Sequence, residues 1–403
     1  MPPILGPFTG TLAGSRAPKS ARSHLRLAGH PRKELITVKM KKIVAIGAAV
    51  GVAIAGFAFA APANAEPVSN SYVLVGSDTL QDSVNALTNG TSISGSFVRV
   101  TSAGATVGSF DAFGSSSIQT KPNGPYFGRP SGSGAGVNAL RASINGTALY
   151  SGNAAVPTKT ISGQVDIARS SSGPGANANA AGLLLYVPYS RDAVSYAYKG
   201  DSAAIGALTT AQLKQVYESN TPVTINGAVV VPRLPQGSSG TRSFFLSAIG
   251  VTTLGSTVND VNNTTPENDA SVLGANEIIP FSAASWVAQS NGATGVSTIG
   301  TTGVQLGSTN GIAPFTGTGT ALVPNSAYYS STLGRDTYVV VEYKRVNSND
   351  PAYDANLAAL IDPTVGQSLT NFGSFATTSG AVKKKFGFLA PVSTTAQRAF
   401  ATI

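Results

Sequence analysis

Short apolar runs alternate with polar turns from residue 71 to the end of the chain. The run 71–76 is typical of a buried strand, and Leu80, Val84 and Leu87 follow at the spacing of one helix face. Gly90 is a typical end for that helix. The same order of strand, polar turn and helix, or of strand and polar turn, occurs three more times, so the pattern predicts an α/β protein with an open sheet.

The four turns share hydroxyl and glycine residues. In the first we expect Asp78 to cap the helix, with Gln81 completing a capping box. In the last, Ser239 or Ser238 is expected to cap a short helix that ends at Gly250. The four turns lie at 77–79, 131–136, 169–172 and 235–243.

Helix starts of this kind suit anions, because free N–H groups coincide with the positive end of the helix dipole. Hydroxyls of Ser239 and Thr241 add donors, and Arg233 and Arg242 flank them with positive charge. One such turn alone is most simply an ordinary capped helix. Four of them at strand ends, where ligands of open α/β sheets bind, predict an anion site.

The remaining pattern predicts how the chain continues. Strands at 183–188 and 193–198 carry it toward a second lobe, and a capped amphipathic helix follows at 208–217. Residues 283–288 are expected to form a helix, with Trp286 in the core or lining a cleft. A strand at 337–346 returns to the first lobe, before helical structure that begins at 357.

The first 65 residues are predicted to comprise an upstream leader and a signal peptide. Residues 1–39 are rich in Pro and Arg, and 40–65 combine a basic start, an apolar middle and Ala63-Asn64-Ala65, which is typical of a signal peptide cut after Ala65. A retained anchor is the alternative. The cut removes nine of 27 basic residues and one of 18 acidic residues, and so leaves 18 against 17. A general positive field for nucleic acid is therefore not expected.

Composition excludes several kinds of chemistry. The chain has no Cys, and both histidines, His24 and His30, precede the predicted cut. A Cys nucleophile, a Ser–His–Asp triad and Cys/His metal sites are thus excluded from the mature part, and we expect no cofactor or metal. A lipid-anchoring Cys is missing too, so the product is expected to be released or held non-covalently.

In their order, the turns resemble those of the phosphate-binding proteins of ABC transporters, in the type 2 periplasmic-binding-protein superfamily. The likeness covers about residues 71–395 and suggests a secreted, actinobacterial-like member. It implies a two-lobed α/β fold with a central cleft, lobe I being 66–190 plus 336–403 and lobe II 191–335. The segments are Gly76-Ser77-Asp78-Thr79, Gly132-Ser133-Gly134-Ala135-Gly136, Val165 to Ser171, Leu208 to Tyr217, Ser239-Gly240-Thr241 and Phe386 to Pro391.

The resemblance also implies the ligand contacts, which are hydroxyls, amides and one guanidinium: Ser77, Thr79, Ser133, Gly134, Ser171, Arg233, Ser239, Gly240 and Thr241. Two positions depart from the family. Ser171 stands where the family has an Asp that accepts a phosphate proton, and Arg233 is two residues farther from Ser-Gly-Thr than is usual. Asp78 or Asp111 is a candidate for the acceptor.

The predicted function is thus capture of phosphate or a related oxyanion by a monomer that serves an ABC permease. Two other readings stay open. One is a secreted phosphatase on the same scaffold, which would need a base other than His, because both histidines precede the predicted cut. The other is a cell-surface binding protein, suggested by the Gly/Thr-rich stretch 290–325 and the missing lipid anchor.

Overall fold

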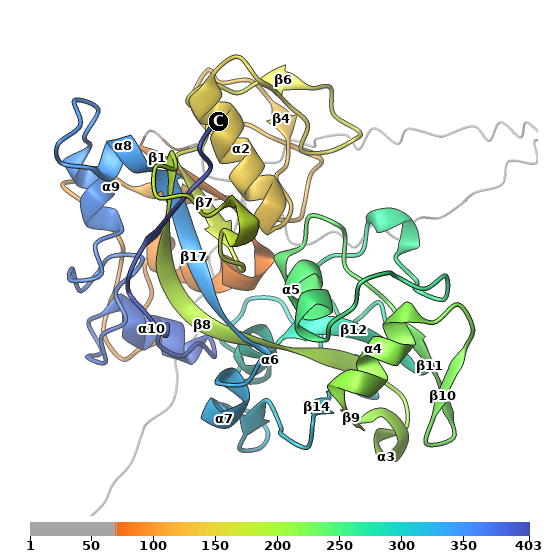
Figure 1. Cartoon of the computed structure of the whole chain (residues 1–403). Helices are drawn as coiled ribbons and strands as arrows, with labels where there is room; N and C mark the ends of the chain where they lie inside the picture. Colours follow the sequence, from red (N-terminus) through yellow and green to blue (C-terminus); the bar gives the residue numbers. More distant parts are fainter. Residues whose placement is uncertain (1–68, 70) are drawn as a thin grey trace, which may run out of the picture. The chain divides into compact units, whose positions relative to one another are not determined.

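The computed structural model describes Ser69 and residues 71–403, all within one compact unit (Figure 1). The leader 1–39 and the signal peptide 40–65 lie outside these residues. Within the described part, the main sheet has ten strands in the order β10-β11-β12-β8-β17-β7-β1-β2, and β13 and β18 both pair with β8. None of the described helices combines the length and apolar character that a membrane crossing requires.

The main sheet consists of β1 (Tyr72–Gly76), β2 (Val107–Ser109), β7 (Ile167–Ser170), β8 (Leu184–Lys199), β10 (Val223–Ile225), β11 (Ala228–Pro232), β12 (Glu277–Ser282), β13 (Val304–Leu306), β17 (Gly334–Glu342) and β18 (Gln397–Ala399). Smaller pairs are β3 (Ser117–Ile118) with β4 (Phe127–Gly128), β5 (Leu149–Tyr150) with β6 (Lys159–Thr160), β9 (Ala207–Leu208) with β14 (Ser308–Thr309), and β15 (Phe315–Thr316) with β16 (Val323–Pro324). The α-helices are α1 (Gln81–Asn89), α2 (Ser133–Asn145), α3 (Ser202–Ile205), α4 (Thr210–Glu218), α5 (Gly240–Ala248), α6 (Ala283–Ser290), α7 (Ser326–Tyr329), α8 (Tyr343–Val346), α9 (Ala355–Leu360) and α10 (Ser379–Lys385). Three short 3₁₀ turns, η1 (Asp78–Leu80), η2 (Gly175–Asn177) and η3 (Val261–Asn263), complete the description.

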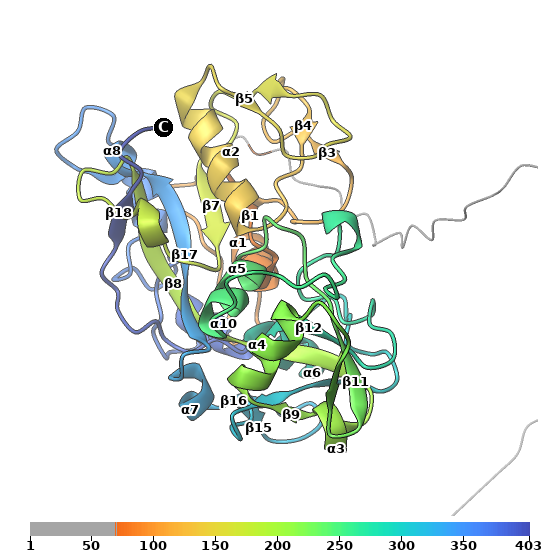
Figure 2. The ribbon, with the colours of Figure 1, turned by 45° about the vertical axis from the view of Figure 1, so that its right-hand side comes forward.

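The first lobe has a sheet that is covered on both faces. Successive residues of β1 point to opposite faces, so Val73 and Val75 enter one core while Tyr72 and Leu74 enter the other. Helix α2 packs in the first of these cores (Figure 2), and α1, α9 and α10 contribute to the second. Burial on both faces explains why β1 is apolar throughout.

The second lobe is built on β12, β11, β10 and the distal half of β8. Its core takes side chains from α4, α5 and α6, including Trp286, whose ring lies 5.5 Å from that of Phe281 in an edge-to-face contact. Helix α4 begins at the predicted capped turn, where Thr209 and Gln212 form a capping box. The predicted α/β fold in two lobes is confirmed.

A single long strand joins the lobes where the sequence pattern predicts two. Residues 184–193 of β8 pair with β17, and residues 194–199 pair with β12. The two-strand prediction is wrong because the polar residues Ser190, Arg191 and Asp192 resemble a turn, yet Ser190 and Asp192 are fully buried within the strand. The exact lobe boundaries stay a prediction.

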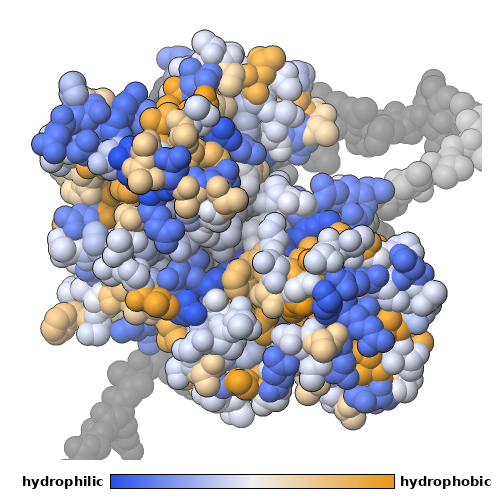
Figure 3. All heavy atoms as spheres, in the orientation of Figure 1, coloured by the Kyte–Doolittle hydropathy of each residue, from blue (hydrophilic) through white to orange (hydrophobic). Residues whose placement is uncertain are grey.

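Two local predictions also need correction. Asp78 does not cap a helix, because Ser77 holds the N-cap position, and Gln81 instead accepts from the N–H of Ala112. The strand predicted at 337–346 ends at Glu342 and is followed by α8. On the face drawn in Figure 3, hydrophilic and hydrophobic residues are interspersed and form no single large apolar patch.

Candidate functional site

The turn after β1 is held in place by a buried arginine. Arg169, on β7, is fully buried and donates to the carbonyl oxygens of Ser77, Gly76 and Phe110. Burial lowers the pKa of Arg169 to about 10, so the guanidinium stays protonated near neutral pH. This brace fixes the start of the segment that carries Thr79, whose side chain is buried as well.

The turns that precede α2 and follow β7 meet through their serines. The hydroxyls of Ser133 and Ser171 lie 3.0 Å apart, and the N–H of Ser171 donates to the Ser133 hydroxyl over 3.0 Å. The N–H of Gly134 donates to the carbonyl of Ser238, 3.2 Å away in the loop before α5. The start of α2 in lobe I therefore contacts the start of α5 in lobe II.

Helix α5 begins as predicted, with Ser239 as N-cap accepting from the N–H of Arg242 at 2.9 Å. Its first residue, Gly240, approaches the serines so closely that an added Cβ would lie 2.4 Å from the Ser133 hydroxyl and 2.5 Å from that of Ser171. Only glycine fits such an approach. The next residue, Thr241, is fully buried, and its hydroxyl lies 3.3 Å from that of Thr79.

The arginine in this cluster is Arg335, on β17, which the sequence reasoning missed. Its Nη2 donates to the Thr241 hydroxyl at 2.9 Å and to the Thr79 hydroxyl at 3.3 Å. Nε and Nη2 also donate to one carboxylate oxygen of Asp192, on β8, at 3.1 and 2.8 Å. The pair lies at the junction of the two lobes, with side chains 2% and 0% exposed.

Arg233, the arginine predicted to contact the ligand, is engaged elsewhere. Its Nε and Nη2 donate to the two carboxylate oxygens of Glu277, each over 3.0 Å. No contact of Arg233 with the cluster around Thr79 and Thr241 is found among the described residues. The bidentate pair links Arg233, which follows β11, to Glu277, the first residue of the neighbouring parallel strand β12.

Acidic and amide groups border the cluster on another side. Glu267 accepts from the N–H of Thr241 at 3.3 Å, near the start of α5. The amide nitrogen of Asn268 donates to the Thr79 hydroxyl at 3.3 Å and to the Asp78 carboxylate at 3.0 Å. Burial, followed by the nearby Glu267, raises the pKa of the Asp78 carboxyl well above its ordinary value. Asp111, the other candidate acceptor, accepts from the side chain of Asn85.

Three buried polar atoms of these segments have no hydrogen-bond partner among the described residues. They are Nη1 of Arg335, Oε2 of Glu267 and the hydroxyl of Ser77. Buried polar atoms nearly always have a hydrogen-bond partner, so these three exceptions are notable. One is a donor, one an acceptor and one can act as either. Arg335 and Glu267 are moreover bound to the same residue, Thr241.

The structure thus brings together most of the residues singled out from the sequence. Thr79, Ser133, Ser171, Gly240 and Thr241 lie in one connected cluster. The turns that carry these residues are fixed by hydrogen bonds of three others, namely Ser77, Gly134 and Ser239. Arg233 lies apart from the cluster and pairs with Glu277. A charged residue at the start of an apolar strand was the available signal for Arg335, whereas Glu267 and Asn268 lie in a loop without periodicity. Within the described residues, no group of three or more His, Cys, Asp or Glu side chains forms a candidate metal site.

No protein-family model matches the chain, and no curated protein matches its sequence. Among solved structures, the chain is similar to an ABC-type phosphate transport receptor from Vibrio cholerae, with 15% identity and a TM-score of 0.45, over 80% of this chain and 100% of that one. It is also similar to PstS from Borrelia burgdorferi, with 14% identity and a TM-score of 0.38, over 79% and 98% of the two chains. A phosphate-binding protein from Stenotrophomonas maltophilia matches with 12% identity and a TM-score of 0.42, over 80% and 91%. At such identities the likeness concerns the course of the chain, and no ligand or partner is carried over from it.

Proposed function

We propose that the protein is a solute-binding protein that encloses phosphate, or a related tetrahedral oxyanion, between its two lobes. The observation that carries the proposal is the buried cluster around Thr241, where a donor of Arg335 and an acceptor of Glu267 both lack partners. A protonated oxyanion offers the complementary groups, because its oxygens accept hydrogen bonds and its proton is donated. The ligand would contact Arg335 together with hydroxyls and amides of both lobes.

Such a site binds mainly through neutral donors and one partly neutralised cation. Asp192 already balances much of the Arg335 charge, so the guanidinium contributes direction more than net charge. Hydrogen bonds to a charged group contribute about 1.5–3 kcal/mol each. The several donors of the cluster are therefore ample for a micromolar complex of about 8 kcal/mol, after ordering and closure are subtracted.

Selectivity would rest on the acceptor. The Oε2 atom of Glu267, which has no hydrogen-bond partner among the described residues, can accept a hydrogen bond from the O–H group of a protonated phosphate. Sulfate has no such proton to donate and would be repelled by the carboxylate. Glu267 would thus serve as the acceptor for the phosphate proton, the role that an Asp has in the family that the turns resemble and that Ser171 cannot take. Asp78 is held by Asn268 beside Thr79, and burial, followed by the nearby Glu267, raises the pKa of its carboxyl well above the ordinary value.

Entry of the ligand requires the lobes to separate. Thr79, Ser133 and Thr241 are each at most 4% exposed, although they belong to different lobes. The continuous connections between the lobes near the site are β8 and the start of β17. We infer that bending at these strands opens the cluster and that the ligand stabilises the closed form.

We further propose that the protein acts outside the cytoplasm as a monomer and delivers its ligand to an ABC permease. The support is the signal-peptide pattern that ends at Ala65 and the exported character of the proteins that its turns resemble. Without a Cys for lipidation, the receptor would diffuse to its permease or associate with the cell surface non-covalently.

Calorimetry on residues 66–403 with phosphate, arsenate, sulfate and a phosphate ester tests the proposal. We expect one ligand per chain, tight binding of phosphate and arsenate, and at least tenfold weaker binding of sulfate. A phosphatase assay on the same sample separates the enzymatic alternative. Turnover that Ser239→Ala abolishes would replace the receptor proposal, and an absence of saturable oxyanion binding would refute it.

A further inference from the structure

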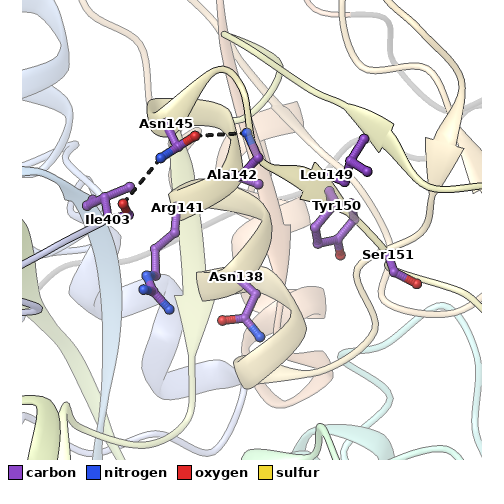
Figure 4. Close-up of a pocket in the computed structure, with 9 residues that line it drawn as sticks. Asn138, Arg141, Ala142, Asn145, Leu149, Tyr150, Ser151 and Ile403 are labelled. Atoms are coloured by element: carbon purple, nitrogen blue, oxygen red, sulfur yellow. Dashed lines mark hydrogen bonds between the residues drawn. The ribbon is translucent and has the colours of Figure 1, made fainter.

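A hollow lies beside α2, next to the cluster. Its volume is about 360 Å³, and it is lined by α2, the segment 170–177, Tyr186 of β8 and Phe400 near the end of the chain. A neighbouring hollow of about 330 Å³ borders the same helix and is drawn in Figure 4. Arg141 and Asn138 line both, so these two side chains stand between them. The larger hollow has the size of small-molecule sites.

Arg141 has no anionic partner among the described residues, although its guanidinium lies over the ring of Phe400. Its Nε is buried and lacks a hydrogen bond, and within the described residues Arg141 forms no salt bridge. No Asp or Glu is among the residues that line either hollow. Figure 4 shows Asn138 and Arg141 projecting from successive turns of α2, while Asn145 is bound to the backbone oxygen of Ile403. Arg141 is therefore available to a bound anion.

The aromatic wall of the hollow is held in an uncommon conformation. Phe400 has a φ of 62°, in the left-handed region that bulky residues rarely adopt. Its N–H donates to the carbonyl of Asn177, and its own carbonyl accepts from the N–H of Leu183, so the neighbouring segments impose this conformation. The result places the ring 4.5 Å from the guanidinium carbon of Arg141. Backbone strain of this kind is found preferentially at functional positions.

We propose that this hollow, the Arg141 pocket, binds a small organic anion. Its carboxylate or phosphoryl group would accept from the Arg141 guanidinium, whose planar fork matches either group. Its apolar body would lie against Phe400 and Tyr186, and Asn138 and Ser172 would offer hydrogen bonds at the rim. The hollow shares Ser133 and Gly134 with the segments around Thr241, but Arg141, Tyr186 and Phe400 do not belong to that cluster. The proposal does not depend on the function proposed for the cluster.

Benzoate and phenyl phosphate are suitable probes, used with residues 66–403 in saturating inorganic phosphate so that the Thr241 cluster is filled. We expect saturable binding of at least one probe by titration calorimetry. Arg141→Gln should weaken that binding at least tenfold, and Arg141→Lys should restore part of it. The affinity for inorganic phosphate, measured separately, should change less than twofold in both variants.

Two results would overturn the proposal. One is the absence of saturable binding of both probes to the unmodified protein, which needs no variant to interpret. The other is equal binding by the unmodified protein and by Arg141→Gln, with thermal denaturation used to show that the variant is folded. If inorganic phosphate fails to bind while a probe binds in an Arg141-dependent way, the Arg141 pocket stands and the proposed function falls.

Discussion

Replacing Arg335 by lysine separates the ligand contact from the structural contact of the same side chain. Arg335 uses Nε and Nη2 for Asp192 and leaves Nη1 without a partner among the described residues. A lysine keeps the positive charge beside Asp192 but is a single point charge that cannot reproduce the guanidinium fork. The variant should therefore fold while losing the donor directed at the ligand.

The expected loss follows from the contacts. A hydrogen bond to a charged group contributes about 1.5–3 kcal/mol, and Nη1 offers at least one to the ligand. Arg335→Lys should thus raise the dissociation constant for phosphate about tenfold to about 150-fold in titration calorimetry. Asp192 is fully buried, so full removal of the cation would leave an unpaired buried charge and cost stability as well, which is why lysine is preferred to alanine.

Arg233→Lys is the matched control. Arg233 also donates to a single carboxylate, that of Glu277, and its side chain is 13% exposed. The same substitution there should leave the affinity for phosphate within a factor of about two, the range of substitutions remote from a site. The reasoning is refuted if Arg335→Lys binds phosphate as the unmodified protein does, or if both variants lose affinity equally.

Three further predictions concern the same cluster. Thr241→Val removes the hydroxyl that accepts from Arg335 and should weaken phosphate binding by about 1–2 kcal/mol in calorimetry, whereas Thr241→Ser should retain most of the affinity; equal loss in both would contradict a role for the hydroxyl. Gly240→Ala places a Cβ 2.4 Å from the Ser133 hydroxyl and should lower the free energy of unfolding by about 1–3 kcal/mol in urea denaturation, and an unchanged midpoint would show that the helix start is not tightly packed. The pKa of Asp78 is raised in the folded protein, so the folded state binds more protons, and stability is lost as pH rises above the ordinary value of 3.8. Asp78→Asn removes this loss and should therefore raise the melting temperature at pH 7 more than at pH 4. An equal rise at both pH values would refute the raised pKa of Asp78.

The layered fold was predictable because the apolar patterns are strong. The strand at 72–76, the helix end at Gly90 and the capped start of α4 all follow from local rules. The prediction failed where tertiary pairing overrides local polarity. Asp192 interrupts an apolar pattern and so suggests a turn, but its partner lies 143 residues away in Arg335 and keeps it within β8.

The candidate site likewise combines features that local sequence predicts with features that only tertiary contacts determine. Hydroxyls and glycines at helix starts are visible in the sequence, because their role depends on neighbours along the chain. The choice between Arg233 and Arg335 depends on which carboxylate each meets in space, and no local pattern records that. Asn268 and Glu267 lie in a segment without regular structure, so only the three-dimensional arrangement places them beside Thr79 and Thr241.

A crystal structure of residues 66–403 grown with arsenate tests the central claim most directly, because the anomalous signal of arsenic locates the anion independently of any model. We predict one strong peak enclosed between the lobes, within hydrogen-bond distance of Nη1 of Arg335 and beside Ser133 and Thr241. A peak at Arg233, or arsenate bound only at the surface with the cluster around Thr241 unchanged, would contradict the account.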